Sequence, residues 1–232
     1  MRFAVATAAW RAARSRVDRS QASYLNAQYD AYLAGMPLTK AARRGIVVGE
    51  RAAAAILAPR ADDGFNKVVL YECSANPPAI GEFEPDGGCG TQPVGVNVGE
   101  MMPFTFQRQS RFRPTGPDPL ASIAYSADFN AVKEHGRADA DLLARTAEQM
   151  DIAYFWQGLD LHGGIVSLPV DHALRVRDAA RFFAMVYTAG ADAKIAGYEA
   201  KYHFRSWRPR SAIPRADADD NPDTAADTDW KP

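Results

Sequence analysis

The sequence predicts an all-α protein, a helical bundle interrupted by one long loop. Long segments rich in Ala, Arg, Gln and Leu contain no Pro, as expected for helices. Most of the Gly and Pro residues fall instead between Pro59 and Pro119, where a regular helix cannot continue. Apolar residues make up 47% of the 232-residue chain, which is enough for the core of one helical domain spanning residues 1–232.

Two helices are predicted before the loop. The first extends from Arg2 to about Ala34, where the sequence "GMP" breaks it. Thr39 is placed to cap a second helix, which stops at Pro59. The short connection predicts an antiparallel helical hairpin.

Residues 59–119 are predicted to form a long loop or arm. A short β-hairpin around Val94 to Phe106 is the one regular element that its pattern allows. A loop of this length within a compact domain is usually functional or packed over the body. Its two cysteines, Cys73 and Cys89, either pair in an oxidising compartment or remain free thiols, and the sequence leaves both open.

Helices return after the loop. One is predicted over Leu120–His135 and another over about Ala138–Trp156. The sequence "GLDLHGGIVSLPV" (158–170) is predicted as a loop. The longest helix follows, from Asp171 to about Trp207, and the acidic, proline-punctuated remainder is predicted to be irregular.

The longest predicted helix has a stripe of small residues flanked by larger apolar ones. The stripe comprises Phe183, Val186, Gly190, Ala193, Gly197, Ala200, Phe204 and Trp207. Alternating spacings of three and four residues place these side chains on one helical face. Small residues allow a neighbouring helix to approach closely, so we expect this helix to be central in the bundle.

Cations gather at the end of the same helix. Lys201 and Arg208 are seven residues apart, almost two helical turns, so they are predicted to share a face, with Arg205 between them. Pro209 then ends the helix. Cations beside a core stripe are costly unless they are paired or point into a polar pocket. Two interpretations follow: a helix end neutralised by the acidic tail, or a site for a phosphate-like anion, which suits the planar Arg fork and the compact Lys charge.

The spacing of Lys201, six residues, then Arg208-Pro209 resembles the first signature of the vanadium-dependent haloperoxidase and type 2 phosphatidic acid phosphatase superfamily. The surrounding "DAKIAGYEAKYHFRSWRPRSAIPRADADDNPDTAADTDWKP" is similar to the bacterial haloperoxidase-like branch, as are "RFRPTGPDPLASIAYSADFNAVKEHG" and "EQMDIAYFWQGLD". The resemblance covers most of the chain. It implies that Lys201 and Arg208 bind phosphate or vanadate, and it assigns no role to His203 or Arg205.

The superfamily's other two signatures, a Pro-Ser-Gly-His segment and a later Ser-Arg followed by His, are not in the sequence. The four histidines, His135, His162, His172 and His203, all lie in other contexts. The resemblance therefore implies the N-terminal portion of a family member, an incomplete domain with no catalytic residue and no direct metal ligand.

The implied function is that of a vanadium-dependent haloperoxidase, halide oxidation by peroxide at a protein-bound vanadate, inactive in this chain alone. Two alternatives remain open: an acid phosphatase of the same superfamily, and a non-catalytic helical remnant with a partial phosphate or vanadate site. Vanadate is the implied cofactor, and phosphate, halide and peroxide are the implied small partners.

Other partners are constrained by composition. A net charge of −1 argues against a nucleic-acid binder driven by bulk electrostatics. No apolar run reaches the length of a membrane-spanning helix, and a homo-oligomer is compatible with the sequence. The family tendency implies export or a periplasmic location, although residues 1–16 do not form a clear signal peptide.

The tail sequence "DADDNPD" partly matches a calcium-binding loop. Asp217, Asp219 and Asn221 fall at alternate positions, as calcium ligands would. Pro222 stands where the loop needs Gly, and Thr228 stands where a bidentate Glu belongs. The sequence therefore favours a solvated acidic loop.

Overall fold

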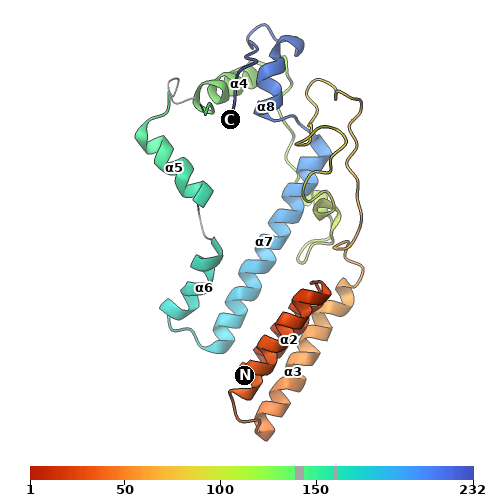
Figure 1. Ribbon diagram of the computed structural model, residues 1–232, viewed down its shortest axis with the longest axis vertical. Coiled ribbons are helices and arrows are strands. Elements are labelled where there is room, and N and C mark those ends of the chain that lie inside the picture. Colours follow the sequence, from red (N-terminus) through yellow and green to blue (C-terminus); the bar gives the residue numbers. More distant parts are fainter. Residues whose placement is uncertain (139–143, 159–160) are drawn as a thin grey trace. The chain divides into compact units, whose positions relative to one another are not determined.

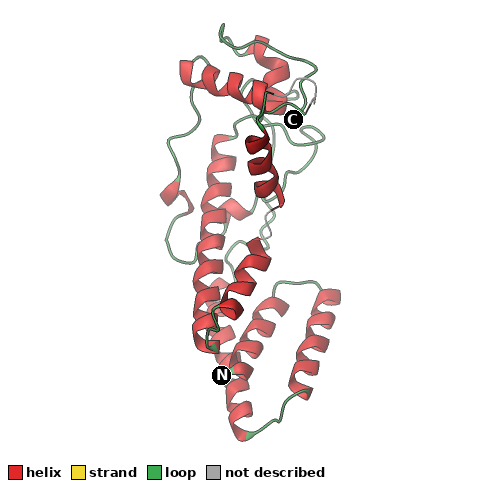
Figure 2. Ribbon diagram, turned by 90° about the vertical axis from the view of Figure 1, so that its left-hand side faces the viewer, coloured by secondary structure: helices red, strands yellow, loops and turns green. Residues whose placement is uncertain are grey.

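The computed structural model describes residues 1–138, 144–158 and 161–232. Within these residues the regular structure is helical, and Figure 2 shows helices joined by loops without a strand. The predicted all-α fold is therefore confirmed, while the hairpin around Val94 to Phe106 is not formed. Contacts divide the chain, predicted as one domain, into two compact units: residues 1–63 with 161–189, and residues 64–160 with 190–232.

The first unit begins with three helices, α1 (Arg2–Arg14), α2 (Arg19–Ala34) and α3 (Lys40–Leu57). The single helix predicted over residues 2–34 is thus two helices, because Asp18 caps α2 by accepting a 2.9 Å hydrogen bond from the backbone N–H of Gln21. Thr39 caps α3 as predicted.

Helix α1 packs against both α2 and α3, which are labelled in Figure 1. Gly49 of α3 lies so close to α1 that a Cβ atom there would be 2.5 Å from the carbonyl oxygen of Ala4 and 2.6 Å from Cβ of Thr7. Thr7 is fully buried, and its hydroxyl lies 2.6 Å from that of Tyr29 in α2. Trp10 stacks on Tyr29, with ring centroids 4.4 Å apart. Close backbone approach and two aromatic residues therefore hold these three helices together.

The first unit also contains α6 (Leu161–Asp171) and the first half of α7 (Val176–Phe204). The prediction of a loop over residues 158–170 is wrong for the described residues 161–170, which belong to α6. Two glycines and Pro169 suggested a break, but glycine lowers helix propensity by only about 1 kcal/mol. Pro169 lies in the last turn of α6, where little helix remains to be disrupted.

The second unit contains α4 (Ile123–His135), α5 (Ala147–Gly158) and α8 (Pro209–Ala212), together with the end of α7. The helix predicted over residues 120–135 is confirmed as α4, with Ser122 as its N-cap. The next predicted helix corresponds to α5, which begins later than expected; residues 139–143 of that prediction lie outside the described residues.

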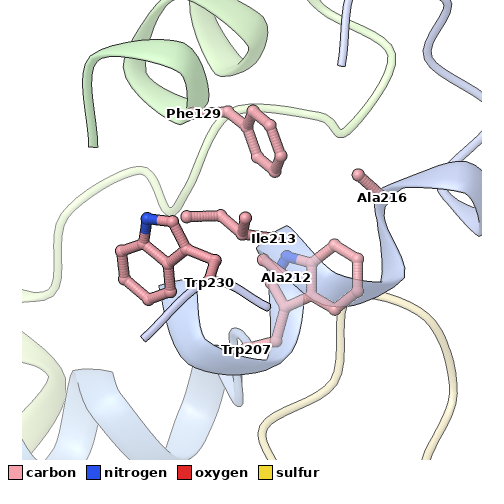
Figure 3. Packing of buried hydrophobic residues seen from close by; sticks show 6 residues of the cluster. All are labelled: Phe129, Trp207, Ala212, Ile213, Ala216 and Trp230. Carbon is pink, nitrogen blue, oxygen red and sulfur yellow. The ribbon is translucent and has the colours of Figure 1, made fainter. Parts of the chain in front are cut away.

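The core of the second unit is a cluster of apolar side chains drawn from α4, α8 and the C-terminal segment. Figure 3 shows its members, Phe129, Trp207, Ala212, Ile213, Ala216 and Trp230. Trp230 also donates a 2.9 Å hydrogen bond from its indole Nε1 to the carbonyl oxygen of Lys133 in α4. The C-terminal segment is irregular, as predicted, apart from α8 and the 3-10 turn Ile213–Ala218, but it forms part of the core.

The predicted acidic loop in this segment is not solvated throughout. Asp219 and Asn221 are both buried. The Asp219 carboxylate accepts hydrogen bonds of 2.9 Å from the backbone N–H of Asn221 and from the hydroxyl of Thr224. Asn221 donates to the carbonyl oxygen of Leu120 at 2.6 Å. These hydrogen bonds hold the tail in place. The described residues contain no group of acidic, His or Cys side chains placed to hold a metal ion.

The long loop covers one side of α7. The buried carboxylate of Asp192 accepts hydrogen bonds of 2.6 and 2.9 Å from the backbone N–H groups of Phe104 and Thr105, and a third from the Thr105 hydroxyl. A loop with few backbone hydrogen bonds of its own needs such partners. Asp192 therefore anchors the loop to the helix.

The predicted small-residue stripe lies away from this covered side. Gly190, Ala193 and Gly197 are exposed, whereas Asp192 and Ile195 are buried. At 100° per residue the two sets lie on opposite sides of α7. A Cβ atom added at Gly190 or Gly197 would meet nothing within 4 Å among the residues of the second unit.

The expectation of no membrane-spanning segment agrees with the structure, because none of the helices in the described residues is both long and apolar enough to cross a membrane.

Substitution by alanine is expected to have opposite effects on stability at two helical glycines, Gly49 and Gly197. Gly49→Ala should lower the free energy of unfolding by about 1–3 kcal/mol, since the new methyl group overpacks the contact with α1. Gly197→Ala should raise it by about 0.5–1 kcal/mol, because alanine favours the helix and meets no neighbour. Urea unfolding followed by circular dichroism measures both, and equal effects would contradict the α1–α3 packing.

Trp230→Ala should destabilise the second unit by about 3 kcal/mol, because it removes a buried indole from the core. Trp156→Ala is the matched control: Trp156 is 69% exposed, so its loss should change stability by less than about 0.5 kcal/mol. Thermal unfolding of the two variants gives the comparison. A small effect of Trp230→Ala would show that the C-terminal segment does not belong to the core.

Candidate anion-binding site

The helix carrying the predicted cations ends at Phe204, three residues earlier than expected. Arg205 adopts a left-handed backbone conformation with φ of 49°, and its N–H donates a 3.1 Å hydrogen bond to the carbonyl oxygen of Lys201. Glycine is the usual residue at such a helix end. The prediction that Lys201 and Arg208 share a helical face is therefore wrong, because Arg208 lies beyond the helix in extended conformation.

The side chain of Arg205 makes contacts that offset this backbone conformation. Its guanidinium lies over the ring of Tyr71, 4.6 Å from the centroid, and pairs with the Glu82 carboxylate at 2.5 Å. Burial raises the pKa of Glu82, but hydrogen bonds from Ser74 and the charge of Arg205 outweigh it and lower the pKa below its ordinary value. Sequence analysis assigned Arg205 no role, since these partners lie more than 100 residues earlier in the chain.

The left-handed turn directs the chain onto the long loop. The carbonyl oxygen of Arg205 accepts a 2.6 Å hydrogen bond from the N–H of Phe83, and the N–H of Trp207 donates to the carbonyl oxygen of Gly81 at 2.9 Å. Glu82 and Ser206 form an isolated antiparallel bridge between these bonds. Residues 205–207 therefore run alongside residues 81–83, and Arg208 emerges next to Phe83.

The structure brings the two predicted site residues together on one aromatic ring. Nζ of Lys201 lies 5.8 Å from the ring centroid of Phe83, and Cζ of Arg208 lies 4.8 Å from the same centroid. Lys201 also lies near the rings of Tyr198 and Tyr202, at 5.2 and 5.0 Å. Aromatic faces attract cations, which helps to hold two like charges close together.

Asp86 is the acidic residue nearest to this pair. One of its carboxylate oxygens lies 3.9 Å from Nη1 of Arg208, and the other forms a close ion pair with Arg210. One interpretation of the sequence was that the acidic tail neutralises the cations at the helix end. In the structure the negative charge beside Arg208 is that of Asp86, which belongs to the long loop. Sequence analysis missed Asp86, Phe83 and Arg210, because no local pattern links the loop to the helix end.

The positive charge of Lys201 is not neutralised by an ion pair among the described residues. Within the described residues its ammonium group has no hydrogen-bond or ion-pair partner, and its contacts are to aromatic rings. Burial and the nearby charge of Arg208 lower the pKa of Lys201 from its ordinary value of 10.5, and Asp86 offsets part of this effect. A lysine in this state gains from any anion that reaches it.

A cavity of about 300 Å³ lies beside the end of α7. Its wall includes Tyr71, Tyr198, Glu199, Tyr202 and His203, but neither Lys201 nor Arg208. The cations instead lie on an open surface, where the Arg208 side chain is 43% exposed. His203 contacts Arg113, with 3.2 Å between their nitrogens, and Arg113 pairs with Glu199. His203 therefore belongs to an ion-pair network beside the cation pair.

The open question about the cysteines is resolved by the structure. Cys73 and Cys89 form a disulfide, which closes the part of the loop that contains Phe83 and Asp86. Gln92 adds a second tie, since its side-chain amide donates to the carbonyl oxygen of Tyr71 and accepts from the Tyr71 N–H. The loop is therefore a defined platform for the site.

No protein-family model matches the chain, and searches of curated proteins and of solved structures gave no match either.

Arg208→Ala should raise the pKa of Lys201 towards its ordinary value, because it removes the neighbouring positive charge. Lys194→Ala is the control: it removes one positive charge from the same helix two turns earlier, and the pKa of Lys201 should not change. Titration of the Lys201 side chain by NMR measures both. A pKa unchanged by Arg208→Ala would show that the two cations are not close in solution.

Proposed function

We propose that the end of α7 binds a tetrahedral oxyanion, phosphate or vanadate, through Lys201 and Arg208. The main support is their convergence on Phe83, since two cations that come from a helix and from the chain beyond it meet at one ring. The spacing of Lys201 and Arg208 in the sequence also supports the proposal.

The charge balance of the site favours a dianion. Lys201, Arg208 and Arg210 bring three positive charges, and Asp86 brings one negative charge. Arg205 does not add to the excess because Glu82 neutralises it. Two unbalanced positive charges match the charge of hydrogen phosphate near neutral pH. Arginine offers paired N–H donors to two oxygens of such an anion, and lysine offers a mobile point charge.

We extend the proposal to a protein like the vanadium-dependent haloperoxidases, on the basis of the resemblance in sequence. A bound vanadate would supply the site for halide oxidation by peroxide. Lys201 and Arg208 would hold the anion and neutralise its charge, and the aromatic rings around Lys201 would exclude part of the water. No catalytic residue is assigned in this chain, because the two signatures that supply the superfamily's histidines are not in the sequence.

The exposure of the cations favours a second candidate, anion binding without catalysis. Catalytic sites commonly exclude water from the reacting groups, whereas Arg208 is 43% exposed and the adjacent cavity does not include it.

An acid phosphatase of the same superfamily would use the same anion site and differ in its reaction. In a chain that also contains the superfamily's other two signatures, bromide oxidation with added vanadate and peroxide, assayed beside phosphate-ester hydrolysis, would separate the two activities; neither is expected from a non-catalytic binder.

Titration with orthovanadate or phosphate should show weak binding, with a dissociation constant on the order of 1 mM. Lys201→Ala and Arg208→Ala should each weaken it by about tenfold, which corresponds to one lost charge-assisted hydrogen bond. Isothermal titration calorimetry at low ionic strength is suitable, because salt screens exposed charges.

Lys194→Ala serves as the matched control, since it removes the same charge from the same helix outside the site; it should leave the dissociation constant within about twofold. Tight binding that neither Lys201→Ala nor Arg208→Ala affects would refute the assignment of the site.

A further inference from the structure

We infer that Asp86 is an internal competitor for the anion site: its carboxylate lies between Arg208 and Arg210 and is displaced when a free oxyanion binds. This inference rests on the proposed function and adds to it a residue that limits affinity. The carboxylate bridges the two guanidinium groups, with one oxygen 3.9 Å from Arg208 and the other in close contact with Arg210. Carboxylate and phosphate oxygens are alternative acceptors for the same arginine donors.

The backbone of Asp86 is held in place, which makes its side chain an effective competitor. The N–H of Gly88 donates a 3.0 Å hydrogen bond to the carbonyl oxygen of Pro85, closing a turn in which Gly87 has φ of 90°. The hydroxyl of Thr91 donates to the carbonyl oxygen of Asp86 at 2.7 Å. The disulfide at Cys89 closes the loop directly after the turn. A group tethered in this way acts at a high effective concentration.

The side chain of Asp86 is nevertheless free to leave. It is 72% exposed, and its carboxylate contacts only the two arginines among the described residues. A structural carboxylate in the same region differs: Glu82 is 11% exposed, and it accepts hydrogen bonds from Ser74 as well as from Arg205. Asp86 can therefore rotate into solvent without breaking the fold, whereas Glu82 cannot.

The two contacts of Asp86 are unequal, which indicates where the free anion enters. Arg210 is anchored to the loop, because its Nη2 donates to the carbonyl oxygen of Glu84 at 3.1 Å, and it makes the closer ion pair with Asp86. Arg208 makes the longer contact and lies against the same ring as Lys201. An incoming oxyanion would therefore bind to Arg208 and Lys201 together. The carboxylate of Asp86 would then move away from Arg208.

The test is a phosphate titration of the intact chain in three forms: unmodified, Asp86→Asn and Glu84→Gln. Asp86→Asn should tighten phosphate binding by about fivefold, the factor expected for loss of a competing exposed ion pair. Glu84→Gln makes the same change in net charge two residues away, and no hydrogen bond or ion pair of its carboxylate is found among the described residues. It should change binding by less than about twofold, so it separates competition from a general charge effect.

A double variant completes the test. Arg208→Ala should abolish the gain from Asp86→Asn, because without Arg208 there is no shared position to compete for. Circular dichroism checks that each variant is folded. The inference is wrong if Asp86→Asn behaves like Glu84→Gln, or if it weakens binding, since Asp86 would then orient the arginines rather than compete with the ligand.

These outcomes also separate the inference from the proposed function. If Lys201→Ala and Arg208→Ala weaken phosphate binding while Asp86→Asn has no effect, the anion site stands and the competitor does not. Binding that is detected only in Asp86→Asn, and is lost on Arg208→Ala, supports the inference. If no form binds phosphate, Asp86→Asn included, both the site and its competitor are refuted.

Discussion

The turn at Arg205 is the constraint on which the candidate site depends. A left-handed conformation costs a non-glycine residue roughly 1–2 kcal/mol, and here it ends α7 and turns the chain onto the long loop. Had the helix continued, the backbone of residues 205–207 could not have bonded to residues 81–83. Arg208 would then not have met Lys201 at Phe83. The contacts of the Arg205 guanidinium with Tyr71 and Glu82 stabilise this turn, so a residue without apparent function positions both cations.

The long loop contributes as much to the site as the helix does. It supplies the aromatic ring, the acidic residue and the backbone partners, although it contains no strand within the described residues. Side-chain contacts order the loop in place of regular secondary structure. Asp192 of α7 accepts hydrogen bonds from the loop backbone, and Gln92 and the disulfide hold parts of the loop together. The Tyr202 hydroxyl also donates to the carbonyl oxygen of Val94. A loop built in this way can hold Asp86 in a fixed place while leaving its side chain exposed.

Local signals made much of the fold predictable, and the failures have a common cause. Thr39 was predicted to cap α3, and it does so because capping involves only neighbouring backbone groups. The spacing of Lys201 and Arg208 singled out both cations, and the anion site that they were predicted to form stays a prediction. The way in which they meet was not predictable, since it depends on Tyr71, Glu82 and Phe83, more than 100 residues away. The small-residue stripe shows the same limit: periodicity finds a face but does not tell what covers it, and a loop covers the opposite side of α7.

The charges around the end of α7 fall into two kinds, and this contrast is the physical case for a binding site. Hydrogen bonds from Arg113 hold the pKa of Glu199 below its ordinary value, and Ser74 and Arg205 do the same for Glu82; these are satisfied ion pairs of the fold. The pKa of Lys201 is lowered for the opposite reason, because burial and a like charge disfavour its ionised form. An anion bound between Lys201 and Arg208 would relieve their unfavourable proximity, and the carboxylate of Asp86, which pairs with Arg208 and Arg210, relieves it in part.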